Sequence, residues 1–115
     1  MEYKLVHIGV NCGCEEKAAQ AADLFALLFD LKTRVGNSSI FAGPYFECMR
    51  VPDARGTNGH IAMAAEDLSK AIEELKAKGF DIVPETLTTD ENGKPKNVYL
   101  KGEFAGFAVH ILQAK

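Results

Sequence analysis

Hydrophobic and polar side chains alternate in residues 4–10, and this pattern predicts a β-strand. The apolar positions of the strand are Val6, Ile8 and Val10. His7 falls on the opposite face with Leu5 and Gly9, because successive side chains of a strand point to opposite sides of a sheet. The histidine is therefore expected to face away from the side that packs under a helix.

Hydrophobic positions recur at helical spacing from residue 15 onward, with acidic side chains in the first turn. This spacing predicts an amphipathic helix that ends near Asp30. Glycine-containing turns separate the short runs that follow, and each run is expected to form a strand: residues 32–35, 38–42 and 45–51. The first half of the chain thus reads as strand, helix and three strands.

The same order starts again in the second half. Residues 59–65 are typical of a strand, Asp67 is a suitable cap for a helix, and Gly79 is placed to end that helix. Three more strands are expected, the first two joined by a long polar loop: residues 80–83, 96–101 and 104–112. The repeated βαβββ order is what an internal duplication leaves behind.

We therefore predict a single α+β domain over residues 1–115, with module one at about 1–52 and module two at about 57–115. A chain of this length is large enough to bury most of its apolar surface but too small for two independent domains. Two βαβββ modules would form a curved mixed sheet with the helices on its outer face. The other face would be concave and open to a small-molecule ligand.

All three histidines of the chain fall on predicted strands and, by alternation, on the concave face. His60 and His110 are flanked there by alanine and glycine. Glu47 is the only acidic residue inside an apolar strand, and its place in module one matches that of His110 in module two. Taken singly, a strand histidine is more often structural and a strand carboxylate more often solvated. The shared face is what makes these four residues a candidate site.

Composition narrows the class of partner. The formal net charge is -3 without a basic cluster, so nucleic acid is not an expected partner. No apolar stretch approaches membrane length, and the odd count of three cysteines argues against an extracellular disulfide framework. A cytoplasmic protein is expected. Arg50, Arg55 and Lys101 could neutralise an anionic substrate, although isolated surface cations are common.

These features together resemble the vicinal oxygen chelate superfamily, which includes glyoxalase I, fosfomycin-resistance proteins, extradiol dioxygenases and bleomycin-binding proteins. The resemblance covers nearly the whole chain and rests on the doubled βαβββ order, the His7-Ile-Gly opening strand and the Gly-His60-Ile strand followed by Asp-Leu. In this superfamily the metal ligands come from the first and last strands of each module. The resemblance therefore implies a metal site at His7, Glu47, His60 and His110.

Three imidazoles and a carboxylate suit a divalent transition metal such as Zn, Ni, Co, Fe or Mn better than Ca or Mg. A closed tetrahedron of four protein ligands would make the site structural. A six-coordinate metal would leave two positions for a substrate with vicinal oxygens, and Glu47 would be the catalytic base in metal-stabilised enediolate chemistry. The expected enzyme is then a glyoxalase-like lyase or isomerase. A dioxygenase would use His7, His60 and Glu47 on Fe(II), with His110 standing aside.

A narrower likeness is to the glyoxalase-like domain appended to some bacterial 2-keto-3-deoxy-6-phosphogluconate (KHG/KDPG) aldolases. It rests on three phrases, residues 36–43, Gly59-His60-Ile-Ala and Gly106-Phe-Ala-Val-His110. The aldolase reaction itself needs a Schiff-base lysine in a (β/α)8 barrel, which 115 residues cannot build. This likeness implies an alternative function, a non-catalytic ligand-binding or regulatory module associated with the aldolase. Related domains often pair, so a homodimer is expected.

One position departs from the glyoxalase pattern. Glyoxalase-like members usually carry glutamate at the final ligand position, where this chain has His110. Only Glu47 then remains as a carboxylate base among the four implied ligands, and the departure argues against glyoxalase I activity in particular.

Overall fold

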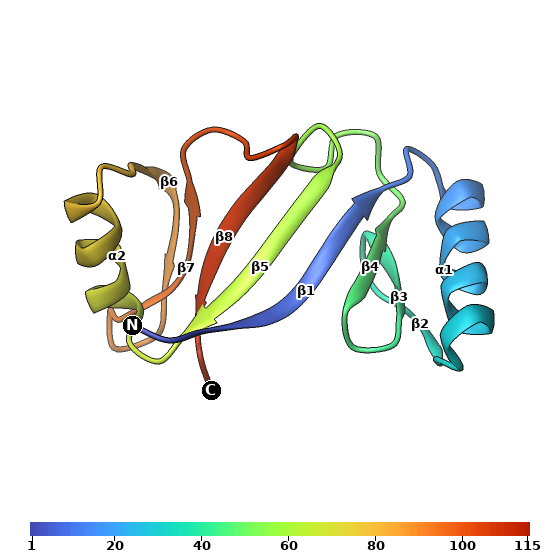
Figure 1. Cartoon of the computed structure of the whole chain (residues 1–115), viewed down its shortest axis with the longest axis horizontal. Coiled ribbons are helices and arrows are strands. Elements are labelled where there is room, and N and C mark those ends of the chain that lie inside the picture. The colour runs from blue at the N-terminus through green and yellow to red at the C-terminus, as the bar shows by residue number, and fades with distance from the viewer.

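The computed structural model describes residues 1–115 as one eight-stranded mixed sheet with two helices (Figure 1). The elements in chain order are β1 (Tyr3–Asn11), α1 (Glu15–Phe29), β2 (Thr33–Val35), β3 (Ser39–Ala42), β4 (Phe46–Met49), β5 (Gly59–Ala65), α2 (Leu68–Ala77), β6 (Ile82–Thr89), β7 (Pro95–Leu100) and β8 (Phe107–Gln113). Both predicted βαβββ units are present, which confirms the α+β class and the element order.

The strand order in the sheet is β2-β3-β4-β1-β5-β8-β7-β6. In each module the first strand pairs in parallel with the last, β1 with β4 and β5 with β8. The two modules join through the antiparallel pair of β1 and β5. The four strands expected to carry the candidate site, β4, β1, β5 and β8, therefore lie next to one another in the middle of the sheet.

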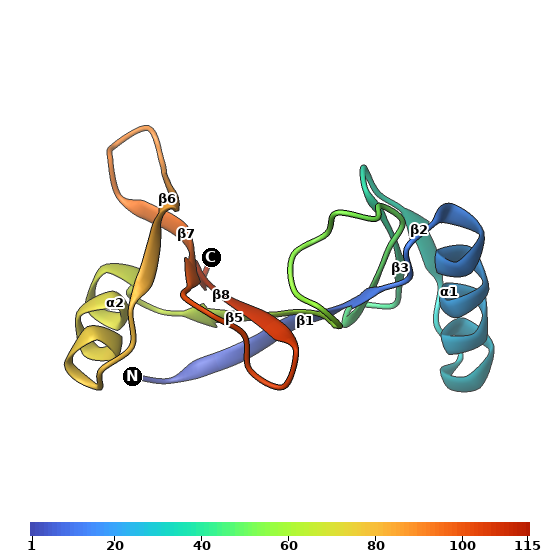
Figure 2. The ribbon, with the colours of Figure 1, turned by 90° about the horizontal axis from the view of Figure 1, so that it is seen from above.

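The sheet is bent into a trough (Figure 2). Helix α1 packs against β3 and β4 at one end, and α2 packs against β5, β7 and β8 at the other. Each helix covers a small core of its own module. The buried members are Ala18, Ala22, Ile40, Ala42 and Cys48 in module one, and Ala65, Leu68, Ala71, Val98 and Ile111 in module two. The helices thus pack against the two ends of the sheet, which form the walls of the trough, and β1, β5 and β8 form the floor between them.

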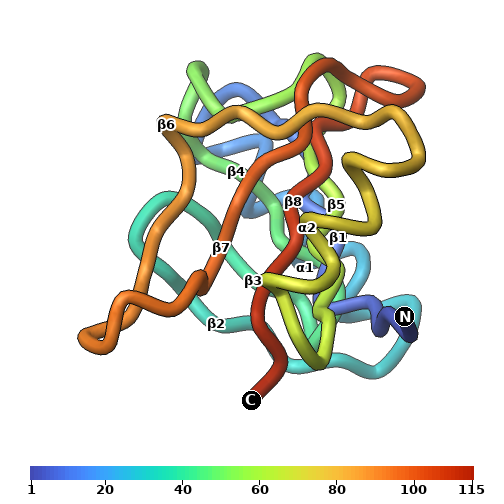
Figure 3. The backbone as a smooth tube through the Cα atoms, turned by 90° about the vertical axis from the view of Figure 1, so that its left-hand side faces the viewer, coloured from blue at the N-terminus to red at the C-terminus, as the bar shows by residue number.

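The ends of the helices follow the predicted signals. The Asp67 carboxylate accepts a hydrogen bond of 3.1 Å from the backbone N–H of Lys70, which caps the N-terminus of α2. Helix α1 ends where Asp30 adopts a left-handed conformation with φ of 55°. The N-terminus precedes β1 and the C-terminus follows β8, and both lie at the same end of these central strands (Figure 1), while the β6–β7 hairpin projects away from the sheet (Figure 3). Neither helix combines the length and apolar character that a membrane crossing demands.

Two local expectations were wrong. A register shift between Leu5 and His7 pairs Leu5 with Met63, so Leu5 lies on the outer face rather than with His7. Strand β6 extends to Thr89, well beyond the predicted end at residue 83. This strand is at the edge of the sheet and is largely exposed, so its sequence carries little of the apolar alternation that marks a central strand.

The outer face of the floor also differs from expectation. Val6, Ile8 and Val10 were expected to pack under a helix, but all three are only half-buried and belong to neither helical core. The helices instead cover the walls of the trough (Figure 2). The convex side of β1 is consequently left without a helix.

Candidate metal site

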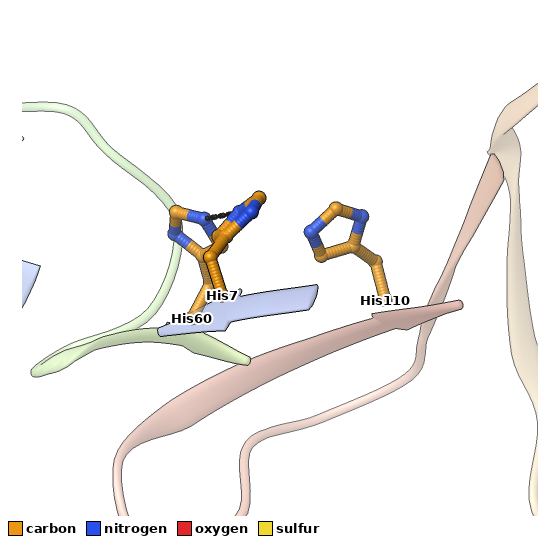
Figure 4. Close-up of side chains that lie close together, drawn as sticks. All are labelled: His7, His60 and His110. Carbon is orange, nitrogen blue, oxygen red and sulfur yellow. Dashed lines mark hydrogen bonds between the residues drawn. The ribbon is translucent and has the colours of Figure 1, made fainter. Parts of the chain in front are cut away.

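The floor of the trough and the adjoining strand β4 bring all four predicted site residues to one face. His7 pairs with Ala62, and Ala62 pairs with His110, so these residues form one cross-strand row. A second row, two residues along, pairs Gly9 with both Glu47 and His60. The three imidazoles rise from the same side of the sheet and converge (Figure 4). The face assignment made from alternation is confirmed for the three histidines.

Three ligand-type atoms lie within hydrogen-bonding distance of one another. Glu47 Oε1 is 3.2 Å from His7 Nε2 and 2.9 Å from His60 Nε2. The two imidazole nitrogens are themselves 3.1 Å apart. The carboxylate oxygen can only accept, and an imidazole nitrogen donates only where it carries the hydrogen, so at least one of the three atoms must share a proton or a cation with the others. The arrangement therefore calls for a proton or a metal ion among the three atoms.

His110 completes the cluster from the neighbouring strand. One ring nitrogen each from His7, His60 and His110 lie within 4.8 Å of one another. His110 Nδ1 is 2.6 Å from the side-chain oxygen of Asn97, an acceptor, so Nδ1 carries the hydrogen and Nε2 carries the lone pair. That Nε2 atom is buried and has no hydrogen-bond partner. A buried acceptor without a partner is uncommon, and a metal ion would satisfy it.

Gly9 makes room for the cluster. A Cβ atom at this position would lie 2.0 Å from Cε1 of His60, so any larger residue would displace the imidazole. The neighbouring positions in the two rows are Ala62 and Ala108, both buried. The small residues that flank the histidines thus leave the space that the imidazole rings occupy.

Electrostatics keep the cluster in the protonation state that a metal needs. Burial lowers the pKa of His7, and the nearby His60 lowers it further although Glu47 opposes the change. Burial, together with the other two imidazoles, lowers the pKa of His110 to about 4. Burial alone would raise the pKa of Glu47, but hydrogen bonds from His60 and Ser39 outweigh it and the pKa falls. At neutral pH the cluster offers lone pairs of His7 and His110 and a carboxylate.

The residues present therefore fit a divalent transition metal. Imidazole nitrogen and carboxylate oxygen are borderline donors of the kind that Zn, Ni, Co, Fe and Mn accept. Glu47 and His110, the ligand candidates on the last strands of the two modules, are each also held by a second residue. Ser39 Oγ donates a hydrogen bond of 2.8 Å to Glu47 Oε2, and Asn97 accepts from His110. Such supporting contacts orient metal ligands in known sites.

Sequence reasoning missed the aromatic surroundings of the site. Phe41 lies edge-on to His7 with ring centroids 6.2 Å apart, and Tyr99 stacks on His110 at 4.7 Å. Arg34 lies over Phe41, and Arg55 lies over Tyr99. A pairing of the last two strands of each module would have placed Phe41 beside Glu47 and Tyr99 beside His110. No signal in the sequence pointed to Arg34.

A sheet of two βαβββ modules joined through their first strands is the vicinal oxygen chelate fold. No family model matches the chain, and no curated protein matches it in sequence. Solved structures do match it over nearly the full length. The hypothetical protein BH1468 from Bacillus halodurans C-125 is similar with a TM-score of 0.65 and 17% identity, over 100% of this chain and 96% of that one.

Methylmalonyl-CoA epimerases show the same fold. One, solved in complex with methylmalonyl-CoA and NH4+, has a TM-score of 0.62 and 13% identity over 99% of this chain and 96% of that chain. The enzyme from Mycobacterium tuberculosis has a TM-score of 0.61 and 14% identity over 96% of this chain and 87% of that chain. At these identities the likeness establishes the fold, and the chemistry has to be argued from the site.

Proposed function

We propose that this chain is a metal-dependent isomerase acting on a small substrate with oxygens on neighbouring carbons. The observation that supports the proposal is the convergence of His7, His60, Glu47 and the unpartnered Nε2 of His110 on the floor of an open trough. His7, Glu47, His60 and His110 would hold the metal. The metal, when bound, would act as a Lewis acid that stabilises negative charge on the substrate oxygens.

Glu47 would move the proton. It is the one carboxylate in contact with the histidines, and its lowered pKa keeps it ionised at neutral pH. Ser39 holds Oε2 and so fixes the orientation of the carboxylate toward the trough. The His110 ring has no lone pair to spare for this role, because Nδ1 is hydrogen-bonded to Asn97 and the unpartnered Nε2 would bind the metal. The chain thus offers one base, which removes a proton from carbon and can return it.

Epimerisation of a carbon next to a carbonyl consists of such a removal and return of a proton. The methylmalonyl-CoA epimerases of the same fold carry out a reaction of this class, as their name states. This supports an isomerase over a lyase for the present chain. The dioxygenase alternative required His110 to stand aside, whereas its ring nitrogen lies within 4.8 Å of those of His7 and His60.

We further propose that the chain forms a homodimer through the convex face of the floor. Leu5 is 42% exposed there, and the apolar side chains of β1 are not covered by a helix. The association with an aldolase remains a prediction. Light scattering at several protein concentrations tests the dimer, and a monomer that persists at the highest concentration would exclude it.

The metal content of the purified protein tests the proposed function. Protein prepared without a nickel column is expected to contain close to one equivalent of a transition metal by elemental analysis, and His60→Ala is expected to lose it. Hydrogen exchange in D2O at the hydroxyl-bearing carbon of hydroxyacetone, whose two oxygens are on neighbouring carbons, tests the chemistry, with Glu47→Gln as the variant that lacks the base. Substoichiometric metal that no substitution changes would overturn the metal site, and exchange that survives in Glu47→Gln would overturn the role of Glu47.

A further inference from the structure

Two of the three arginines of the chain lie at the border of the site, one from each side. The Arg34 guanidinium carbon is 4.4 Å from the centroid of the Phe41 ring, and the Arg55 guanidinium carbon is 4.4 Å from that of Tyr99. Each of these rings in turn contacts a site imidazole, Phe41 at His7 and Tyr99 at His110. One aromatic ring therefore separates each guanidinium from the metal-site cluster.

The third arginine, Arg50, has a structural role. The Arg50 guanidinium donates to the carbonyl oxygens of Gly36 at 2.7 Å and Asn37 at 2.6 Å, and it approaches Glu15 at 3.5 Å. It thereby holds the turn between β2 and β3. Arg50 was one of the cations that the sequence offered for an anionic substrate, and the structure gives it a different role.

Arg34 and Arg55 have no such partners. No carboxylate lies within 4.0 Å of either guanidinium, and neither side chain donates a hydrogen bond to the protein. Both are exposed, so their planar donor groups are available to a ligand. Stacking over an aromatic ring restricts a guanidinium without using its N–H groups, which leaves it pre-organised for a carboxylate or phosphoryl group.

Arg55 also lies close to the site itself, because its guanidinium stacks on Tyr99, whose ring centroid is 4.7 Å from that of His110. Glu47 is the only acidic side chain that contacts the histidines. With a divalent metal bound, the positive charges there would outnumber the single negative charge of Glu47. The border of the site thus carries two guanidinium groups beside the one carboxylate of Glu47.

We propose that the ligand of this site is a small dianion, with one acidic group bound by Arg34 and the other by Arg55. The inference rests on the proposed function, which assigns the oxygens between the two acidic groups to the metal. The acidic groups are carboxylates or phosphoryl groups, the two classes that a guanidinium binds through paired hydrogen bonds. A neutral sugar or diol would leave both guanidinium groups without partners.

Binding of small molecules with two acidic groups tests the inference. Succinate and 2-phosphoglycolate serve as probes, and the neutral diamide succinamide is the matched control for charge. Calorimetric titrations use the metal-loaded protein and the same protein after metal removal. Arg34→Gln and Arg55→Gln are each expected to weaken binding of the tighter probe by about 10-fold or more, as loss of a charge-assisted hydrogen bond does. Lys76→Gln, which removes the same charge from the surface of α2, is expected to leave the affinity unchanged.

Arginine side-chain NMR gives a second readout that does not depend on activity. Only three Nε–H signals are expected, one for each arginine. Saturation with succinate or 2-phosphoglycolate should shift those of Arg34 and Arg55 and leave that of Arg50 in place. The preferred probe distinguishes a carboxylate site from a phosphoryl site.

The two proposals fail in different ways. Metal-loaded protein that binds succinamide as well as succinate, or whose dianion affinity survives both arginine substitutions, would overturn the dianion inference and leave the metal site standing. Protein that holds no metal but still binds a dianion through both arginines would support the anion site and overturn the proposed isomerase.

Discussion

The two modules build the same scaffold and place different chemistry on it. In module one, β3 and β4 pair Phe41 with Glu47, and Ser39 supports Glu47 from two residues before the aromatic ring. In module two, β7 and β8 pair Tyr99 with His110, and Asn97 supports His110 from the corresponding position. The two modules thus have in common an aromatic ring, a ligand candidate and a supporting polar side chain at equivalent positions.

What differs between the modules is the charge of the last-strand residue. Glu47 contacts both first-strand histidines and is held ionised, whereas His110 is held neutral and keeps one nitrogen free of protein partners. A symmetrical scaffold therefore carries an asymmetrical site, with one base and one neutral donor. The supporting residues differ accordingly: Ser39 donates to the Glu47 carboxylate, and Asn97 accepts from the His110 imidazole.

The largest loss of metal affinity is expected on substitution of the first-strand histidines, His7 and His60, where the two modules are alike. His60→Ala should weaken metal binding by more than about 1,000-fold, because loss of a ligand exceeds the 10–100-fold typical for loss of a supporting residue. His7→Ala should do the same. Competition with a chromogenic chelator measures both affinities. A change of less than 10-fold in either variant would contradict their equivalence.

In the metal-free protein, His110 and Glu47 should lower the stability of the folded chain in different ranges of acid pH. The pKa of His110 is about 4 in the folded chain, below the ordinary 6.5, so the unfolded state binds the proton more tightly. The His110 contribution to the free energy of unfolding is therefore complete above pH 6.5. It is lost as the pH falls toward 4, and the loss is at most about 3 kcal/mol. The remaining acid sensitivity from Glu47 should appear only below the ordinary pKa of a carboxylate.

Urea unfolding at several pH values between 7 and 4 measures this dependence. His110→Gln should reduce the slope in that window to the part that His7, whose pKa is also lowered, contributes, while Glu47→Gln should leave the His110 contribution in place. Equal slopes in the parent chain and His110→Gln would show that His110 is not held neutral.

The modules also differ in the small residue beside the imidazole rings, which is Gly9 in module one and Ala62 in module two. Gly9→Ala should weaken metal binding by about 10–100-fold, because the added Cβ displaces the His60 ring from Glu47. Ala62 occupies the corresponding place in module two, and Ala62→Gly should change the affinity by less than about 3-fold. In a double-mutant cycle with His60→Ala, the effect of Gly9→Ala should vanish. An effect that persists in the His60→Ala background would point to backbone distortion instead.

The smallest effects are expected for the supporting residues. Asn97→Ala should weaken metal binding by about 10-fold, since it removes the partner that fixes the His110 tautomer. Ser39→Ala should have a smaller effect, because Glu47 retains its contacts with two histidines. Asn97→Asp keeps an acceptor and should restore binding. If Asn97→Asp binds metal no better than Asn97→Ala, the hydrogen bond to His110 is not what Asn97 contributes.

Much of this molecule could be predicted because its patterns are local. Period-two alternation placed His7, His60 and His110 on one face, and the Asp67 cap marked the second helix. The bulge near Leu5 and the polar edge strand β6 could not be predicted, since neither depends on a local pattern. The aromatic and arginine neighbours were missed for a related reason: contacts across strands need the register, which the sequence of one strand does not contain.

Anomalous diffraction from crystals of the cobalt-loaded protein would locate the metal and its ligands. A single strong peak is expected on the floor of the trough, about 2.0–2.2 Å from nitrogens of His7, His60 and His110 and from a Glu47 oxygen, the usual range for such ligands. A peak elsewhere, or one that omits His110, would contradict the claim that both modules contribute their first and last strands to one metal.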